Sequence, residues 1–254
     1  MSDKSSVSSA ASEIGHWYTR DGKPVYTVIG KNGQERATTL RDARTNGYVP
    51  SVTTVLQCAA KPGLERWKAE QVLLAGLTLP RLPDEDEKSW MARVWEDSKQ
   101  QAQKAAERGT VIHGAIERRL RGESVEDDLK PYADAALDCI EAKYGQMPWS
   151  PEKSFASPLG YGGKVDLHAP GLVLDFKTKD GDVSDVKCYQ DHHMQCAAYA
   201  AGLGMVVAEC GIVFVSRTQP QASLVLHSPD ETMRGLAMFK ALLDYWYAQT
   251  GLAR

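Results

Sequence analysis

Apolar and polar residues alternate with the period of short β-strands in two parts of the chain. Residues 16–39 combine β-prone runs with the turn signals Asp21-Gly22 and Asn32-Gly33, which predicts three small strands. In the second half, apolar runs bounded by turn residues predict strands over residues 152–156, 161–168, 172–178, 211–216 and 222–226. We therefore expect a small β region near the start of the chain and a larger sheet later.

Helical spacing of apolar positions accounts for much of the remaining chain. Helices are predicted over residues 40–46, 52–60, 64–75, 88–120, 131–144, 183–202 and 230–249. The longest of them is expected to be interrupted near Gly109-Thr110. This order of elements is typical of an α/β fold, with a mixed central β-sheet flanked by helices and a helical N-terminal elaboration.

Composition divides the chain into three expected regions. Residues 1–13 are rich in serine and predict a disordered tail. Residues 14–47 hold the small β-hairpins, and residues 48–254 are expected to form the main domain. Within that domain, residues 77–108 begin with prolines and acidic residues and continue as an almost wholly polar helix. Such a helix is either a solvated surface or an arch over a groove.

The composition is that of an ordinary globular chain of 254 residues, 43% hydrophobic, with a formal net charge of -3. This charge does not by itself indicate a nucleic-acid binder, although a local basic groove can coexist with acidic metal ligands. Apolar runs fall short of the roughly 18–20 residues that cross a bilayer, and the first residues lack the apolar core of a signal peptide. We expect a cytoplasmic protein without a membrane partner.

Cysteine spacing argues against a metal–sulfur site. The sequence contains five cysteines: Cys58, Cys139, Cys188, Cys196 and Cys210. None of them forms a Cys-x-x-Cys pair, so we expect reduced thiols, no zinc and no iron–sulfur cluster. The glycine-rich phosphate loops and the Gly-x-Ser-x-Gly elbow are also absent, which excludes the common nucleotide-binding and serine hydrolase motifs.

The strongest chemical signal is a pair of aspartates and a lysine on two expected strands. If Pro170-Gly171 is a two-residue turn, Asp166 lies opposite Asp175, with Cβ atoms about 4.5–5.5 Å apart. Lys177 shares a face with Asp175, because side chains alternate along a strand. Close carboxylates repel unless a cation lies between them, and their oxygens favour a hard divalent ion. A charged surface hairpin is the alternative, but the apolar run around Asp175 favours a buried site.

Two helical pairs could support this site. His113 and Glu117 are four residues apart, as are Gln195 and Tyr199, so each pair shares one helix face. The first pair is a ligand candidate only if its helix abuts the strands, because a helical histidine is more often packed or capping. The second pair either orients the lysine or a phosphate, or is an incidental glutamine and tyrosine on an amphipathic helix.

The remaining histidines give weaker signals. His192 and His193 are adjacent on an expected helix, so their side chains point in different directions and cannot easily bind one ion. We expect both to face solvent or phosphate. His227 is isolated in the sequence and predicts nothing by itself.

Taken in chain order, these blocks resemble the RecB-like branch of the PD-(D/E)XK nuclease superfamily. The matching residues are His113, Asp166, Asp175-Phe176-Lys177 and Gln195-Cys196-Ala197-Ala198-Tyr199. A further block, Pro50–Gln57 followed by Leu64–Lys68, is similar to the mitochondrial genome maintenance exonucleases and to related phage and bacterial nucleases. The resemblance spans about residues 48–215 and implies a restriction-endonuclease-like core.

The resemblance also implies one or two Mg²⁺ or Mn²⁺ ions and a role for each matching residue. The side chains implied to bind metal are His113, Asp166 and Asp175. Further ligand candidates are Glu117 and the backbone carbonyl of Phe176. The residues implied to assist the attacking water or to support the site are Lys177, Gln195 and Tyr199. The superfamily often has glutamate where this chain has Asp175, and the mitochondrial-type members resemble this chain in using aspartate.

The implied activity is exonucleolytic hydrolysis of DNA from free, single-stranded ends. The setting would be phage or bacterial DNA replication, recombination or repair, with a protein of those pathways as a candidate partner. The expected DNA contacts are Trp90, Arg93, Trp95, Lys99, Lys104, Lys179 and His192. The alternative for the two tryptophans is packing, the usual role of tryptophan on a long helix. Alternatives are a structure-specific or defence-related endonuclease, a ring-forming recombination exonuclease that acts on duplex ends, and a catalytically inactive nucleic-acid-binding subunit.

Overall fold

The computed structural model describes residues 16–254, so the tail predicted over residues 1–13 lies outside the described part. Its centre is a five-stranded sheet in the order β5-β6-β7-β8-β9. The strands are β5 (Ser150–Ser157), β6 (Tyr161–Ala169), β7 (Leu172–Lys179), β8 (Glu209–Ser216) and β9 (Ala222–Leu226). Strands β7 and β8 are parallel and the other neighbours are antiparallel. The predicted α/β fold with a mixed sheet is confirmed.

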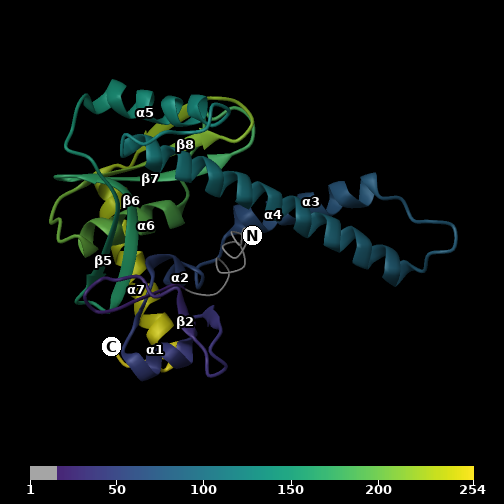
Figure 1. The fold of residues 1–254 in the computed structure, drawn as a ribbon, viewed down its shortest axis with the longest axis horizontal. Helices are drawn as coiled ribbons and strands as arrows, with labels where there is room; N and C mark the ends of the chain where they lie inside the picture. The colour runs from purple at the N-terminus through teal and green to yellow at the C-terminus, as the bar shows by residue number, and fades with distance from the viewer. Residues whose placement is uncertain (1–15) are drawn as a thin grey trace.

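Helices cover both faces of this sheet (Figure 1). They are α2 (Val52–Leu56), α4 (Glu87–Leu120), α5 (Lys130–Tyr144), α6 (Gln190–Gly202) and α7 (Pro229–Thr250). One core contains Ile112 of α4 together with Leu174 and Val213 of the sheet. A second core contains Phe239 of α7 and Phe214 of β8. Within residues 16–254, the helices are too short or too polar to span a membrane.

A small β region precedes the sheet. Its elements are β1 (Trp17–Tyr18), β2 (Thr27–Ile29), β3 (Glu35–Ala37), α1 (Leu40–Asn46) and β4 (Val49–Pro50). Strands β2 and β3 form the expected hairpin around Asn32-Gly33. Strand β1 pairs with β4 and also forms an antiparallel bridge, Tyr18↔Pro24, across the predicted turn at Asp21-Gly22. Thr39 caps α1, and Gly47 ends it in the left-handed conformation at φ 70°, where glycine has no steric penalty.

An antiparallel pair of helices projects from the body (Figure 1). It consists of α3 (Pro62–Thr78) and the first part of α4, and we call residues 62–108 the arm. The arch-like segment predicted over residues 77–108 lies in it. The predicted break at Gly109 is wrong, because α4 is continuous over 34 residues. A Cβ at Gly109 would lie 2.6 Å from Thr178 Oγ1, so this glycine permits close contact between α4 and β7.

Two other helices are shorter than predicted. The helix expected over residues 183–202 begins only at Gln190, because residues 182–189 form a polar loop. In this loop the Val183 N–H donates to Gln221 Oε1, and the Tyr189 N–H donates to His192 Nδ1. The helix expected over residues 52–60 ends at Leu56, after Ser51 has capped its start.

Gly235→Ala should destabilise the protein by about 1–3 kcal/mol through overpacking. A Cβ at this position would lie 2.6 Å from the carbonyl oxygen of His193 and 2.7 Å from its carbonyl carbon. Backbone atoms of α6 cannot yield as a flexible side chain does. Gly76→Ala is the matched control, because its nearest neighbour would be 3.9 Å away and alanine favours helices. Urea unfolding compares them, and equal midpoints would contradict the tight α6–α7 contact.

Candidate active site

The hairpin of β6 and β7 positions the two aspartates. The strands pair as Leu167↔Leu174, His168↔Val173 and Ala169↔Leu172, the register that a turn at Pro170-Gly171 predicts. Continued by one step, this register sets Asp166 across from Asp175. The backbone ladder stops at that point, because the Phe176 N–H donates to Asp166 Oδ2 at 2.9 Å instead of to β6 backbone. The side chain of Asp166 is thereby fixed by the neighbouring strand.

Helix α4 crosses β7 and places His113 against Asp166. The His113 Nε2 lies 3.0 Å from Asp166 Oδ2, and its ring meets that of Phe176 edge-on at 5.5 Å between centroids. Burial alone would raise the pKa of Asp166, but the charges of His113 and Lys177 lower it to about 2. Burial would likewise lower the pKa of His113, yet the Asp166 carboxylate raises it above its usual value. The contact with Asp166 therefore favours the protonated form of His113.

Asp175 is buried, with 1% of its surface exposed. Lys177 Nζ lies 2.5 Å from its Oδ2, and Gln195 Nε2 donates to its Oδ1 at 3.0 Å. The same Gln195 amide donates to Tyr199 Oη at 3.0 Å, so the helical pair on α6 does share a face and meets the strand pair. Burial raises the pKa of Asp175 to about 7, Lys177 opposes this rise and Asp166 adds to it.

Glu152 joins this group, although it is not among the residues predicted from the sequence. The β5–β6 register pairs Pro151↔Leu167 and Lys153↔Val165, which sets Glu152 across from Asp166. Among the described residues it is the one non-glycine with a positive φ, at 56°, a costly backbone conformation that occurs often at functional sites. The carboxylate forms an ion pair with Lys164. Counting the hairpin register back from Ser157 and Tyr161 would have revealed this position.

A cleft of about 490 Å³ opens beside these residues. It is lined by Ala106, Gly109, Thr110, His113, Gly114, Glu117, Glu152, Lys164, Phe176, Lys177 and Thr178. The Lys177 side chain is 32% exposed, whereas that of Asp175 behind it is 2% exposed. Glu117 lines the cleft but pairs with Arg121 at 2.7 Å.

The donor set fits a hard divalent cation. Ligand atoms of His113, Glu152 and Asp166 all lie within 4.8 Å of one another. One imidazole nitrogen with carboxylate oxygens suits Mn²⁺ and Mg²⁺ better than softer metals. Asp175 is less available as a ligand than Asp166, because Lys177 and Gln195 contact its two oxygens. The metal role of the Phe176 carbonyl stays a prediction.

Two of the residues predicted to contact DNA form hydrogen bonds and an ion pair within the arm instead. Trp90 Nε1 donates to the Leu79 carbonyl at 2.7 Å. Arg93 binds the carboxylate of Glu85 through two nitrogens, at 2.7 and 3.0 Å, and also reaches the Pro80 carbonyl. These contacts hold the connection between α3 and α4, so neither side chain is free in this conformation.

The other predicted DNA contacts differ in exposure. Trp95 is 55% exposed and Lys99 Nζ lies 5.9 Å from its ring centroid, while Lys104 is also exposed. Lys179 Nζ lies 5.2 Å from the ring of Tyr189. The expectation that His192 faces solvent is wrong, because it is 7% exposed and its Nδ1 accepts from the backbone. Burial lowers the pKa of His192 to about 3.

Comparison with known proteins gives distant structural likeness only. No family model and no curated protein matches the chain. A candidate exonuclease from Eubacterium rectale is 11% identical, with a TM-score of 0.42 over 58% of this chain and 69% of its own. The alkaline exonuclease LHK-Exo from Laribacter hongkongensis is 15% identical, with a TM-score of 0.29 over 61% of this chain and 86% of its own. Identities and TM-scores this low support no conclusion about activity. Any conclusion about the chemistry must therefore come from the residues of the site.

Proposed function

We propose that this chain is a metal-dependent nuclease that hydrolyses phosphodiester bonds of DNA. The observation that carries the proposal is the convergence of His113, Asp166, Asp175 and Lys177 beside an open cleft. Buried charges reduce stability unless they are well paired. A group of this kind next to solvent is therefore a candidate for function more than for structure.

The chemistry divides between an ion and the side chains around it. A bound Mg²⁺ or Mn²⁺, held by His113, Glu152 and Asp166, would neutralise phosphate charge and lower the pKa of a water molecule. Lys177 presents an ammonium group to the cleft, where negative charge accumulates as the phosphodiester is attacked. Asp175 holds Lys177, and Gln195 fixes Asp175 from α6.

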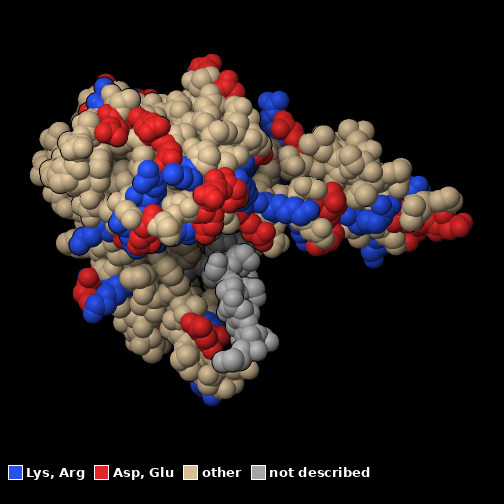
Figure 2. All heavy atoms as spheres, turned by 45° about the horizontal axis from the view of Figure 1, so that its top comes forward, with Lys and Arg blue, Asp and Glu red and all other residues tan. Residues whose placement is uncertain are grey.

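The arm supports action on a free strand. Trp95, Lys99 and Lys104 are exposed along α4, the same helix that carries His113. The rise of 1.5 Å per residue puts Trp95 about 27 Å from His113 along the helix axis. Aromatic stacking and lysine–phosphate contacts are the usual means of holding single strands. Acidic residues are interspersed with the basic ones on the face of the arm that Figure 2 shows, so this face is not a continuous basic surface.

Linear single-stranded DNA should be degraded in Mg²⁺ or Mn²⁺, while a covalently closed circle of the same sequence should persist. Only the linear form offers an end. End-labelled substrates on a denaturing gel measure both, with chelator as the control that stops the reaction. Equal cleavage of the circle would make the protein an endonuclease. Intact substrates of every kind, with metal present, would refute nuclease activity.

A further inference from the structure

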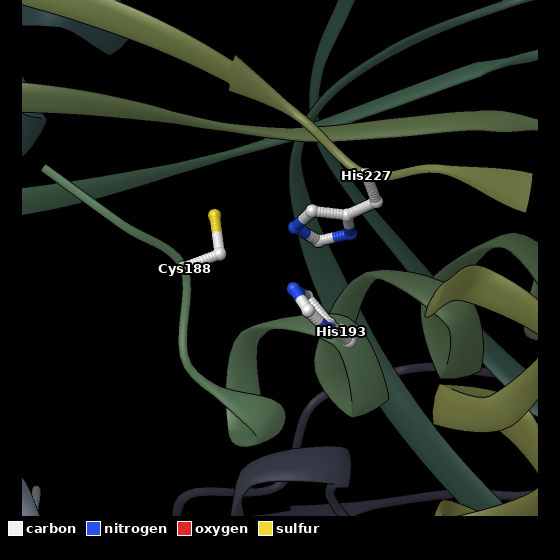
Figure 3. A group of neighbouring side chains, drawn as sticks. All are labelled: Cys188, His193 and His227. Carbon is white, nitrogen blue, oxygen red and sulfur yellow. The ribbon is translucent and has the colours of Figure 1, made fainter. Parts of the chain in front are cut away.

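A second group of potential metal ligands lies outside the cleft. Cys188 belongs to the loop before α6, His193 to the first turns of α6, and His227 to the connection between β9 and α7. Their side chains point toward a common space (Figure 3), and their ligand atoms all lie within 4.8 Å of one another. The three residues come from separate segments, so no spacing rule along the chain detects them.

The state of His227 indicates that this space is built for a ligand. The residue is 5% exposed, and neither ring nitrogen has a hydrogen-bond partner among the described residues. Figure 3 shows its ring directed between Cys188 and His193. The ring centroids of His193 and His227 lie 4.4 Å apart. An imidazole buried without partners costs free energy, and most buried polar groups in proteins are satisfied.

We propose that Cys188, His193 and His227 bind one Zn²⁺ ion. Thiolate sulfur and imidazole nitrogen are the ligands that zinc prefers. Bond lengths of about 2.0–2.3 Å place ligand atoms of a tetrahedral zinc about 3.3–3.8 Å apart, so modest side-chain movement would complete the site. Glu231 is the candidate fourth ligand, because its Oε1 lies 4.0 Å from His193 Nε2 while its Oε2 caps α7.

This site is chemically distinct from the cleft. The cleft offers carboxylate oxygens and one imidazole, which suit Mg²⁺ and Mn²⁺. The Cys188 site offers sulfur and two imidazoles. The expectation of no zinc rests only on the absence of Cys-x-x-Cys pairs. That criterion cannot detect a site whose ligands come from three separate segments.

The proposed zinc is structural. It would join the loop over residues 182–189 and the β9–α7 connection to α6, the helix that carries Gln195 and Tyr199. A ligand that binds only the folded protein raises its stability by mass action. Zinc should therefore raise the melting temperature without being required for the chemistry in the cleft.

Cobalt substitution tests the proposal independently of nuclease activity. Metal-free protein titrated with Co²⁺ should develop a sulfur-to-cobalt charge-transfer band that saturates at one equivalent and disappears when Zn²⁺ is added. Cobalt in the cleft cannot produce this band, because no cysteine lines the cleft. Asp166→Asn should therefore leave it unchanged, and so should Cys58→Ser as the matched cysteine control.

Cys188→Ser should abolish the band, and His227→Gln should weaken zinc binding at least tenfold. Both should lose the zinc-dependent rise in melting temperature. A wild-type protein without the band would overturn the proposal even if the variants failed to fold. A band that kept full intensity in Cys188→Ser would overturn it as well. Loss of nuclease activity in any variant has no bearing on this outcome.

Discussion

Lys177→Ala should lower the rate of DNA hydrolysis by about 10²–10³-fold, the usual cost of removing one preorganised electrostatic group from an active site. The ammonium group is held 2.5 Å from Asp175 Oδ2, and its side chain reaches the cleft. Alanine removes the positive charge that would face the developing negative charge on the phosphate. Asp175→Ala should cause a loss at least as large, because it also releases Lys177.

The control for Lys177→Ala is a lysine of the same sheet that lies away from the cleft. Lys153 of β5 is exposed and is absent from the cleft lining, so Lys153→Ala should keep normal activity. Lys177→Arg separates the effect of charge from the effect of shape. It keeps the positive charge, but a planar guanidinium does not replace an ammonium group in a tight site. Initial rates with saturating Mn²⁺ measure the effect, and circular dichroism checks the fold. Near-normal rates for Lys177→Ala would refute the assignment.

Local patterns predicted the centre of the site. The turn at Pro170-Gly171 sets the register of β6 and β7, and alternation along β7 places Asp175 and Lys177 on one face. Both rules act over a few residues, so the sequence alone suffices. The approach of His113 is different in kind. Its position on a helix is a local property, but the crossing of α4 over β7 depends on Gly109 contacting Thr178, which no local rule anticipates.

Features that depend on distant segments escaped prediction. Glu152 lies across from Asp166 in the register of the β5–β6 hairpin and could have been found by counting, but its strained backbone conformation leaves no mark in residue spacing. His192 was expected at the surface, yet α6 packs so closely on the sheet that this histidine is buried. The grouping of Cys188, His193 and His227 likewise exists only after α6 and α7 come together.

Stability of the metal-free protein should fall as pH rises from about 4 to 7, and Asp175→Asn should remove much of this fall. The pKa of Asp175 is raised to about 7 from 3.8. Between these values the unfolded chain has lost the proton that the folded chain keeps, so stability decreases with pH. The raised pKa of His113 also makes stability decrease with pH, above about pH 6.5, because deprotonation of His113 removes its stabilising interaction with Asp166. The lowered pKa of Asp166 matters only below about 4.

At pH 8, with a chelator present to keep the protein metal-free, the Asp175→Asn variant should be more stable than wild type by roughly 2–4 kcal/mol. Its side chain is neutral, and each unit of pKa shift corresponds to about 1.4 kcal/mol. Lys177 keeps contact with water, because its side chain is 32% exposed. Urea unfolding at pH 5 and pH 8 measures the difference, with the exposed Asp127→Asn as the control. A variant less stable than wild type at pH 8 would mean that the Lys177 pair favours ionised Asp175. The expected result makes Asp175 a residue that lowers stability in its ionised form, and proteins retain such residues where activity requires them.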